Sequence, residues 1–595
     1  MEENKLKQER DMNKTKLLTK KAKTLLFALL LGAPLAASAQ GDILIDETNF
    51  PDEAFRNYLL SQSYGADGVL TKAEIKEITQ IDVYHKNISS LKGIEHLTAL
   101  EKLYCHNNQL TELDISKNTA LTDLSCSYNH LTDIDLSDNT VLTVLNCYVN
   151  LLTALDLSNN KQLEHLYCAD NQLAALDVSN NTALTYMDCN RNQLTALDLS
   201  SNKLLEDLYC DNNQLTALDV SSNTALVDLS CSGNPLTALD LPKHSALETL
   251  YCTDTQLTAL DVSEHTVLGS FSCHDNPQLT TLNVSGCTAL KWLHCYNCQL
   301  VDLNVSGCTA VMQIDCYDNQ LTTLDVSGCT ALLQLDCYNN QLTTLNASGC
   351  EEILGISCYN NQLTALSVSG CTILRNLSCF DNQFTSLDLS NHPNLEVLGC
   401  NNNQLTTLDL SKNTKIGYLN CSNNQLATLD LSNNTNMYYL DCSNNRLATL
   451  DVSNFTTTNH CSLVCARNQI KGAAMDALVG SLPQTEFTGL NIPFYFVVYD
   501  NTELDEGNVC TKSQMVEAKA KGWTPSYFYF ENGELALAEY EGIDDDDPMG
   551  VAQSTTEKAG RESAPVYTLS GQKVASGLNG RKGVHVVGGK KVLIK

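Results

Sequence analysis

Cysteine could carry most of the chemistry in this chain, because its 26 thiols could form disulfides, bind zinc or take part in redox reactions. Most of them recur at one place in a 21-residue pattern. On adjacent parallel strands such a side chain repeats about every 4.8 Å, but the Cβ vectors then point the same way and not at each other. We therefore interpret these cysteines as buried thiols that pack like small hydrophobic side chains. They are Cys105, Cys126, Cys147, Cys168, Cys189, Cys210, Cys231, Cys252, Cys273, Cys295, Cys316, Cys337, Cys358, Cys379, Cys400, Cys421, Cys442 and Cys465.

Two smaller cysteine patterns have less obvious roles. Cys295-Tyr-Asn-Cys298 has the spacing of zinc and redox motifs. However, Cys298 replaces the asparagine of its repeat, so packing is favoured over either role. Five further cysteines follow a Ser-Gly pair, where stacked small side chains are favoured over occasional disulfides. This second file is Cys287, Cys308, Cys329, Cys350 and Cys371.

The other residue types form no catalytic arrangement. None of the 12 histidines stands in an HExxH motif, and neither a GxSxG elbow nor a phosphate-binding glycine loop occurs. The sequence therefore predicts no catalytic residues, no metal site, no cofactor and no enzymatic activity.

An aspartate recurs in the Leu-Asp-Leu/Val-Ser part of the pattern, for example at Asp219. Stacked carboxylates would repel one another, so the file could be a calcium ladder or a set of local hydrogen bonds. We favour Asx-type bonds to backbone N–H groups. Asn283, Asn304, Asn346 and Ser367 interrupt the file, which backbone bonding tolerates and a metal ladder does not.

The residue after the repeated cysteine is aromatic in five successive repeats. Trp292 adds a further ring at one end, and Asp315, Asp318, Asp336 and Asp381 flank the file. One interpretation is that stacked rings only stabilise a sheet. The other is that exposed rings on a concave face bind a ligand, either a sugar chain or a basic peptide. The predicted ligand-binding residues are Trp292, Tyr296, Tyr317, Tyr338, Tyr359 and Phe380.

The pattern that positions these residues reads LxxLxCxxNxLxxLDVS and returns every 21 residues. It predicts a leucine-rich repeat, an α/β solenoid with a short parallel β-sheet on its concave face and a cap at each end. Each turn should supply one strand over LxxLxC, and the asparagine that follows should satisfy backbone groups at the bend. The outer half of each turn should be extended or 3₁₀.

The ends of the chain differ from the repeats. Residues 1–39 have the basic region, the apolar core and the cleavage site of a signal peptide. Residues 42–77 predict a helix-loop-helix cap, and residues 63–74 align with an EF-hand loop that lacks several ligands, so a structural role is favoured over calcium binding. The predicted solenoid spans 78–470, an α/β C-terminal cap 471–541, an acidic linker 542–562 and a small β module 563–595.

The net charge of −32 argues against nucleic acid and anionic membranes as partners. After the signal region no apolar run is long enough for a transmembrane helix. Neutral, basic or glycan ligands are therefore favoured.

The repeats resemble those of internalin-like bacterial surface proteins, and their NQLTxLDxS variants resemble exported Bacteroidetes proteins. Residues 49–77 are similar to the EF-hand-like cap of internalins, and 566–574 and 583–592 resemble C-terminal sorting modules. The resemblance implies a secreted or surface protein, exported through the outer membrane, that binds a host protein or glycan. The alternative is a structural surface protein that associates with itself or with neighbouring cells.

Overall fold

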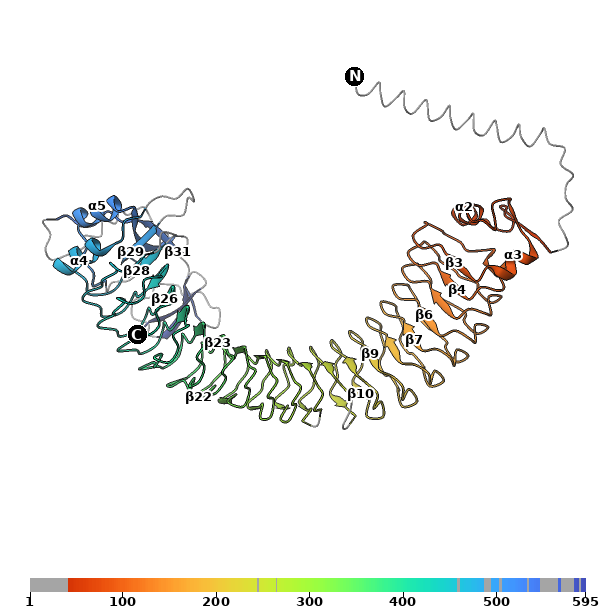
Figure 1. Ribbon diagram of the computed structural model, residues 1–595, viewed down its shortest axis with the longest axis horizontal. Coiled ribbons are helices and arrows are strands. Elements are labelled where there is room, and N and C mark those ends of the chain that lie inside the picture. The colour runs from red at the N-terminus through yellow and green to blue at the C-terminus, as the bar shows by residue number, and fades with distance from the viewer. Residues whose placement is uncertain are drawn as a thin grey trace, which may run out of the picture. The chain divides into compact units, whose positions relative to one another are not determined.

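The computed structural model describes residues 41–242, 246–263, 265–456, 461–485, 494–501, 506–531 and 534–545, together with three short strands near the C-terminus (Figure 1). The predicted signal peptide and most of the predicted linker lie outside the described residues. The chain divides into two compact units, Met1–Leu194 and Thr195–Lys595. Both are stacks of the 21-residue turns that the sequence predicts, and the chain is a leucine-rich repeat solenoid.

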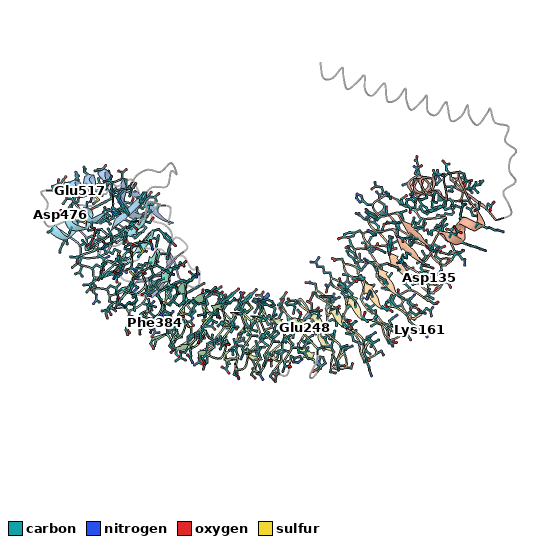
Figure 2. The ribbon with its side chains drawn as sticks, in the orientation of Figure 1. Asp135, Lys161, Glu248, Phe384, Asp476 and Glu517 are labelled. Carbon is teal, nitrogen blue, oxygen red and sulfur yellow. The ribbon has the colours of Figure 1, made fainter. Side chains whose placement is uncertain are left out.

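Each turn is built around buried apolar side chains at the pattern positions. In the turn that begins at Leu205, the side chains of Leu208, Cys210, Leu215 and Val220 are all buried. Where Phe384 replaces the usual leucine it is also buried (Figure 2). Because a single turn cannot bury these side chains by itself, the interior forms only when turns stack.

The strands are parallel and pair in register, so that equivalent residues of successive turns lie side by side. They are three residues long and end before the repeated cysteine, which makes the predicted LxxLxC strand too long. Pairing nevertheless continues beyond each strand, since the Cys210 N–H donates to the Ser230 carbonyl at 2.9 Å. The chain leaves the sheet two residues later, where Asn212 has a φ of 54°.

In the first unit, helix α2 (Glu53–Ser61), strand β2 and helix α3 (Lys72–Glu77) precede the turns. The Asp52 carboxylate caps α2 and also accepts a hydrogen bond from the Ser89 N–H at 2.8 Å, which ties α2 to the first turn. A 3₁₀ helix, η1, follows at Ile94–His96. The strands of this unit are β1 (Ile43–Leu44), β2 (Val69–Leu70), β3 (Gln80–Asp82), β4 (Lys102–Tyr104), β5 (Asp123–Ser125), β6 (Val144–Asn146), β7 (His165–Tyr167) and β8 (Tyr186–Asp188).

The second unit continues the same turns, and in Figure 1 its main strands line the inner side of its curve. They are β9 (Asp207–Tyr209), β11 (Asp228–Ser230), β13 (Thr249–Tyr251), β15 (Ser270–Ser272), β17 (Trp292–His294), β19 (Gln313–Asp315), β21 (Gln334–Asp336), β23 (Gly355–Ser357), β24 (Asn376–Ser378), β25 (Val397–Gly399), β26 (Tyr418–Asn420), β27 (Tyr439–Asp441) and β28 (Ser462–Val464).

The outer half of the turns is extended, as predicted, and pairs as short strands in the middle of the second unit. These outer strands are β10 (Ala217–Asp219), β12 (Ala238–Asp240), β14 (Ala259–Asp261), β16 (Thr281–Asn283), β18 (Leu303–Asn304), β20 (Thr323–Asp325) and β22 (Thr344–Asn346).

After the last turn, the chain forms helix α4 (Ala473–Ser481), strand β29 (Phe494–Asp500) and helix α5 (Lys512–Ala520). Strand β29 pairs in parallel with β28, and β30 (Trp523–Glu531) and β31 (Glu534–Glu539) extend the sheet. The tail contains an antiparallel sheet of β32 (Val566–Thr568), β33 (Gly583–Val587) and β34 (Lys590–Ile594). Across the described part of the chain, no helix has the length and apolarity needed to span a bilayer. The domain boundaries themselves stay predictions.

A buried asparagine side chain bonds two successive turns together. The Asn424 Nδ2 donates to the carbonyls of Cys421 in its own turn, at 3.1 Å, and of Cys400 in the turn before, at 3.0 Å. Its Oδ1 accepts from the Leu405 N–H at 2.9 Å. The same bonds recur at Asn108 in the first unit. This confirms the predicted role of the asparagine at the bend.

At a second buried position, on the outer side of the turns, asparagine, histidine or cysteine makes the same contact with a backbone carbonyl. Asn160 donates to the carbonyl 24 residues before it, Leu136, at 3.2 Å. His392 contacts the Val368 carbonyl at 3.1 Å, and the Cys308 thiol donates to the Val284 carbonyl at 3.2 Å. The Ser-Gly-Cys cysteines therefore replace asparagine as donors. All 26 cysteines are free and buried, which confirms the packing interpretation.

The recurring aspartates make local bonds, as predicted. The Asp409 carboxylate accepts from the Ser411 N–H at 2.9 Å, and this bond together with the Ser411 hydroxyl lowers the pKa of Asp409. The amide oxygen of Asn304 accepts the equivalent bond from Ser306 at 3.0 Å. An amide oxygen therefore accepts the same bond at this position.

We predict that Asn424→Ala lowers the free energy of unfolding by about 2–4 kcal/mol, because it leaves buried backbone groups of two adjacent turns without partners. Asn433→Ala, which removes an exposed asparagine from the adjacent outer bend, should change it by less than about 0.5 kcal/mol. Urea unfolding followed by circular dichroism measures both values. Equal effects of the two substitutions would contradict the assigned role.

We also predict a pH dependence from the aspartate bonds. A carboxyl whose folded pKa lies below its unfolded value adds stability above the unfolded pKa, about 3.9, and loses it as the pH falls through the folded pKa. Replacing Asp388, Asp409 and Asp430 by asparagine should lower the stability at pH 7, because a neutral amide accepts the bond without the charge of the carboxylate, and should reduce the loss of stability between pH 5 and pH 3. Urea midpoints at these pH values provide the measurement, and an unchanged loss on acidification would refute the assignment.

Candidate functional site

The candidate site lies on the face of the second unit that carries the main strands, which we call the strand face. Alternate residues of each strand point to it: Trp292 is 43% exposed and His294 half-buried, whereas Leu293 between them is buried. The residue after the repeated cysteine continues the alternation, so Tyr296 also lies on this face, half-buried. Because pairing is in register, each such position forms a file across the turns.

Five of the predicted site residues form one continuous ring stack, which we call the tyrosine ladder. Its members are Tyr296, Tyr317, Tyr338, Tyr359 and Phe380. Successive ring centroids lie 4.5, 4.4, 4.4 and 4.2 Å apart, and the rings are within 7–9° of parallel. The strand spacing of about 4.8 Å holds identical side chains at a stacking distance, so the ladder follows directly from register.

This geometry decides which parts of the rings a ligand can reach. Within the ladder both faces of Tyr317, Tyr338 and Tyr359 are covered by neighbouring rings, so they offer ring edges and hydroxyl groups only. A sugar chain therefore cannot stack on the faces of these three rings, which limits how the sugar ligand considered from the sequence could bind. The last ring is different, because the next residue of its file is Asn401 and not an aromatic residue.

The other end of the ladder was not foreseen. His274 stacks on Tyr296 with a centroid separation of 4.3 Å, and its Nδ1 lies 2.8 Å from Asp275. The signal was present in the sequence, since His274 directly follows the repeated Cys273. Trp292 belongs to a different file and is not part of the stack; instead Lys291 Nζ lies 5.8 Å from its ring centroid.

The flanking acids are largely occupied by neighbouring side chains. Asp315 lies 2.7 Å from His294 Nδ1 and accepts from the Gln313 amide, and Asp336 accepts from the Gln334 amide at 2.9 Å. Asp318 accepts from the Asn339 amide at 2.7 Å. These carboxylates therefore hold the strand face together, and fewer of them are available to a basic ligand than the sequence suggested.

The ladder phenols stay protonated at neutral pH. Burial, and then the electrostatic influence of Tyr359, Asp318 and Asp336, which disfavours a negative charge on the phenol, raise the pKa of Tyr338 to about 12. The hydroxyls are therefore neutral groups that can donate and accept hydrogen bonds.

Two motifs that suggested other chemistry have structural roles. The Glu74 carboxylate, at the last place of the EF-hand-like loop, accepts from the Thr71 N–H at 2.8 Å in a capping box at the start of α3. The Cys298 thiol donates to the Cys273 carbonyl at 3.4 Å. Burial raises the pKa of Cys298 to about 11, which leaves it unreactive at neutral pH.

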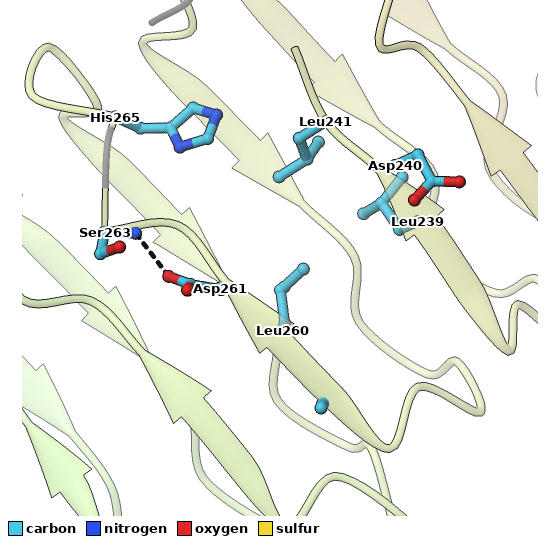
Figure 3. A pocket seen from close by; sticks show the side chains of 8 residues that line it. Leu239, Asp240, Leu241, Leu260, Asp261, Ser263 and His265 are labelled. Carbon is cyan, nitrogen blue, oxygen red and sulfur yellow. Dashed lines mark hydrogen bonds between the residues drawn. The ribbon is translucent and has the colours of Figure 1, made fainter. Parts of the chain in front are cut away.

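A hollow of about 370 Å³ lies on the outer side, between strands β12 and β14 (Figure 3). Leu239, Leu241 and Leu260 line it together with Asp240 and Asp261. Figure 3 shows that the Asp261 carboxylate already bonds the Ser263 N–H, at 2.9 Å. Among the residues that the structure describes, no group of three or more His, Cys, Asp or Glu side chains could hold a metal ion.

The turns define the class of protein, a leucine-rich repeat protein, and part of its sequence is similar to an internalin. Over 70 residues the chain is 37% identical to internalin J of Listeria monocytogenes serotype 4b, a match that covers 12% of this chain and 8% of internalin J. A family model described as the LVIVD repeat matches residues 164–189.

Solved structures are also similar to the chain. The functional domain of InlJ from Listeria monocytogenes, which includes a cysteine ladder, is 26% identical, with 85% of this chain and 94% of that chain covered and a TM-score of 0.45. YopM from Yersinia enterocolitica is 21% identical, with 76% and 96% covered and a TM-score of 0.45.

We predict that Tyr338→Ala lowers the free energy of unfolding by about 1–3 kcal/mol, because it removes two ring contacts of about 0.5–1.5 kcal/mol each. Tyr251→Ala serves as the control: this tyrosine is 38% exposed on the strand face, bonds Ser270 and makes no ring contact within the described residues. Urea unfolding of both variants measures the difference. A smaller loss for Tyr338→Ala than for Tyr251→Ala would show that the stack does not stabilise the fold.

Proposed function

We propose that this protein is a non-enzymatic recognition protein, secreted or at the cell surface, that binds a protein or glycan through the strand face. The observation that carries the proposal is the tyrosine ladder, which places a row of phenol hydroxyls and ring edges on one accessible face. The signal-like N-terminus, the sorting-like tail and the similarity of the repeats to internalin J support the location.

The ladder suits recognition because its groups are already ordered. Each ring is held by its neighbours at 4.2–4.5 Å, so little side-chain freedom remains to be lost on binding. Tyrosine combines apolar area with a hydroxyl and is enriched among residues that dominate binding energy. Since three of the four flanking acids, Asp315, Asp318 and Asp336, are bonded within the face, the ladder fits a neutral polar surface better than a basic one.

The same features argue against catalysis as the role of this face. The pKa values of the Tyr317 and Tyr338 phenols and of the Cys298 thiol lie above their usual ranges, so none of these groups supplies a nucleophile at neutral pH.

We predict that the purified protein binds at least one member of a panel of extracellular-matrix proteins and glycans, and that Tyr317→Phe with Tyr338→Phe weakens this binding at least tenfold. The double Phe variant keeps both rings and loses only the hydroxyls, so its unfolding curve should match that of the natural protein. Surface plasmon resonance gives the affinities. The double Ala variant removes the rings and should abolish binding.

Retained affinity in both double variants would exclude the ladder as the binding site. If neither the natural protein nor the variants bound any panel member, and sedimentation showed assembly that the Ala variant loses, self-association would replace ligand recognition.

A further inference from the structure

A hollow of about 230 Å³ opens on the strand face where the tyrosine ladder ends. It is lined by Ser378, Phe380, Val397, Gly399, Asn401, Tyr418 and Asn420. The ladder belongs to the turns before it, and a second ring stack, of Tyr418 on Tyr439 at 4.5 Å, begins after it. The hollow therefore lies between two separate stacks of aromatic rings.

Register explains why the face is open here. Strand β25 pairs between β24 and β26, so that Gly399 lies between Ser378 and Asn420, and Val397 lies beside Tyr418. The turn of β25 thus has smaller side chains at two positions of this face: Asn401 stands where the turn before has Phe380, and Val397 stands where the turn after has Tyr418. A Cβ atom on Gly399 would lie 3.6 Å from the Phe380 ring, an ordinary contact. The absence of a side chain at Gly399 therefore leaves the space beside the Phe380 ring unfilled.

The polar groups of the hollow are neutral, and two of them are available to form hydrogen bonds with a ligand. Within the described residues, the Ser378 hydroxyl and the Asn401 side-chain amide make no hydrogen bond. The amide oxygen of Asn420 accepts from the Ser422 N–H at 3.1 Å, which fixes its orientation. The lining contains no charged residue.

We propose that this hollow binds one ring of an uncharged sugar, which stacks on the free face of Phe380 and exchanges hydrogen bonds with Ser378, Asn401 and Asn420. The inference extends the proposed recognition function to a ligand class and to residues outside the ladder.

The lining selects among ligands. A purely apolar group would leave the Ser378 and Asn401 polar atoms desolvated without partners, and a charged group would find no counter-charge. The volume is below the about 300–1,000 Å³ of sites for drug-sized ligands, which suits a single ring. The other rings of a longer sugar chain could then lie along the ladder, where they would contact the edges and hydroxyl groups of the tyrosine rings.

The test fills the hollow without disturbing the backbone. Gly399→Val places a β-branched side chain in a strand, where such residues are favoured, and projects it toward Phe380. Gly269→Val is the matched control, because its Cβ would meet only backbone atoms at 3.7 Å or more and it lies outside the hollow. Thermal unfolding of both variants establishes that each is folded.

Saturation-transfer difference NMR of the full protein with the methyl glycosides of glucose, galactose, mannose and N-acetylglucosamine measures sugar binding. We expect saturation transfer to at least one glycoside, loss of at least 90% of that signal in Gly399→Val and in Phe380→Leu, and no change in Gly269→Val. The inference would be overturned if none of the four sugars received saturation from the natural protein. It would also be overturned if Gly399→Val transferred as much saturation to the sugar as the natural protein does. Neither result affects the proposed function, which the hydroxyl-deletion variants of the ladder test separately.

Discussion

The structure depends on satisfying the backbone groups where the chain bends out of the sheet. A turn of 21 residues with a three-residue strand exposes many N–H and C=O groups toward the interior, and each would cost about 1–3 kcal/mol if buried without a partner. One asparagine amide in most turns resolves this, since it bonds to its own turn and to carbonyl and N–H groups of the turn before. The same amide thereby fixes the spacing and register of the stack.

Fixed register turns repetition in the sequence into files of identical side chains. When the repeated residue is cysteine, the file is a column of small buried groups whose pKa values are raised by burial. When it is tyrosine on the strand face, the spacing between strands brings rings to 4.4 Å and a ladder forms. When a turn carries glycine in place of a larger residue, as at Gly399, the file is interrupted and a hollow opens. The binding features of the face are thus local departures from a uniform repeat.

Several side chains that could bind ligands are instead used to hold the fold together. Glu74 caps a helix, and Asp315 and Asp336 bond histidine and glutamine side chains of the strand face. Sequence analysis identified the file of rings and the acids beside it, but it could not assign the partners of those acids. Gln313 and Gln334 lie only two residues before the acids they bond, yet the contact depends on both side chains pointing to the same face and on their rotamers.

The sequence alone determined the solenoid, the 21-residue turn, the buried thiols and the aspartate bonds, because each follows from a periodicity that repeats many times and from chemistry local to one turn. It also placed the five rings in one file. Only the tertiary structure decided that the rings cover each other's faces, that His274 completes the stack and that Phe380 opens onto a hollow. These properties depend on side-chain torsion angles and on the sizes of the side chains that adjacent turns place side by side. A repeat pattern in the sequence contains neither kind of information.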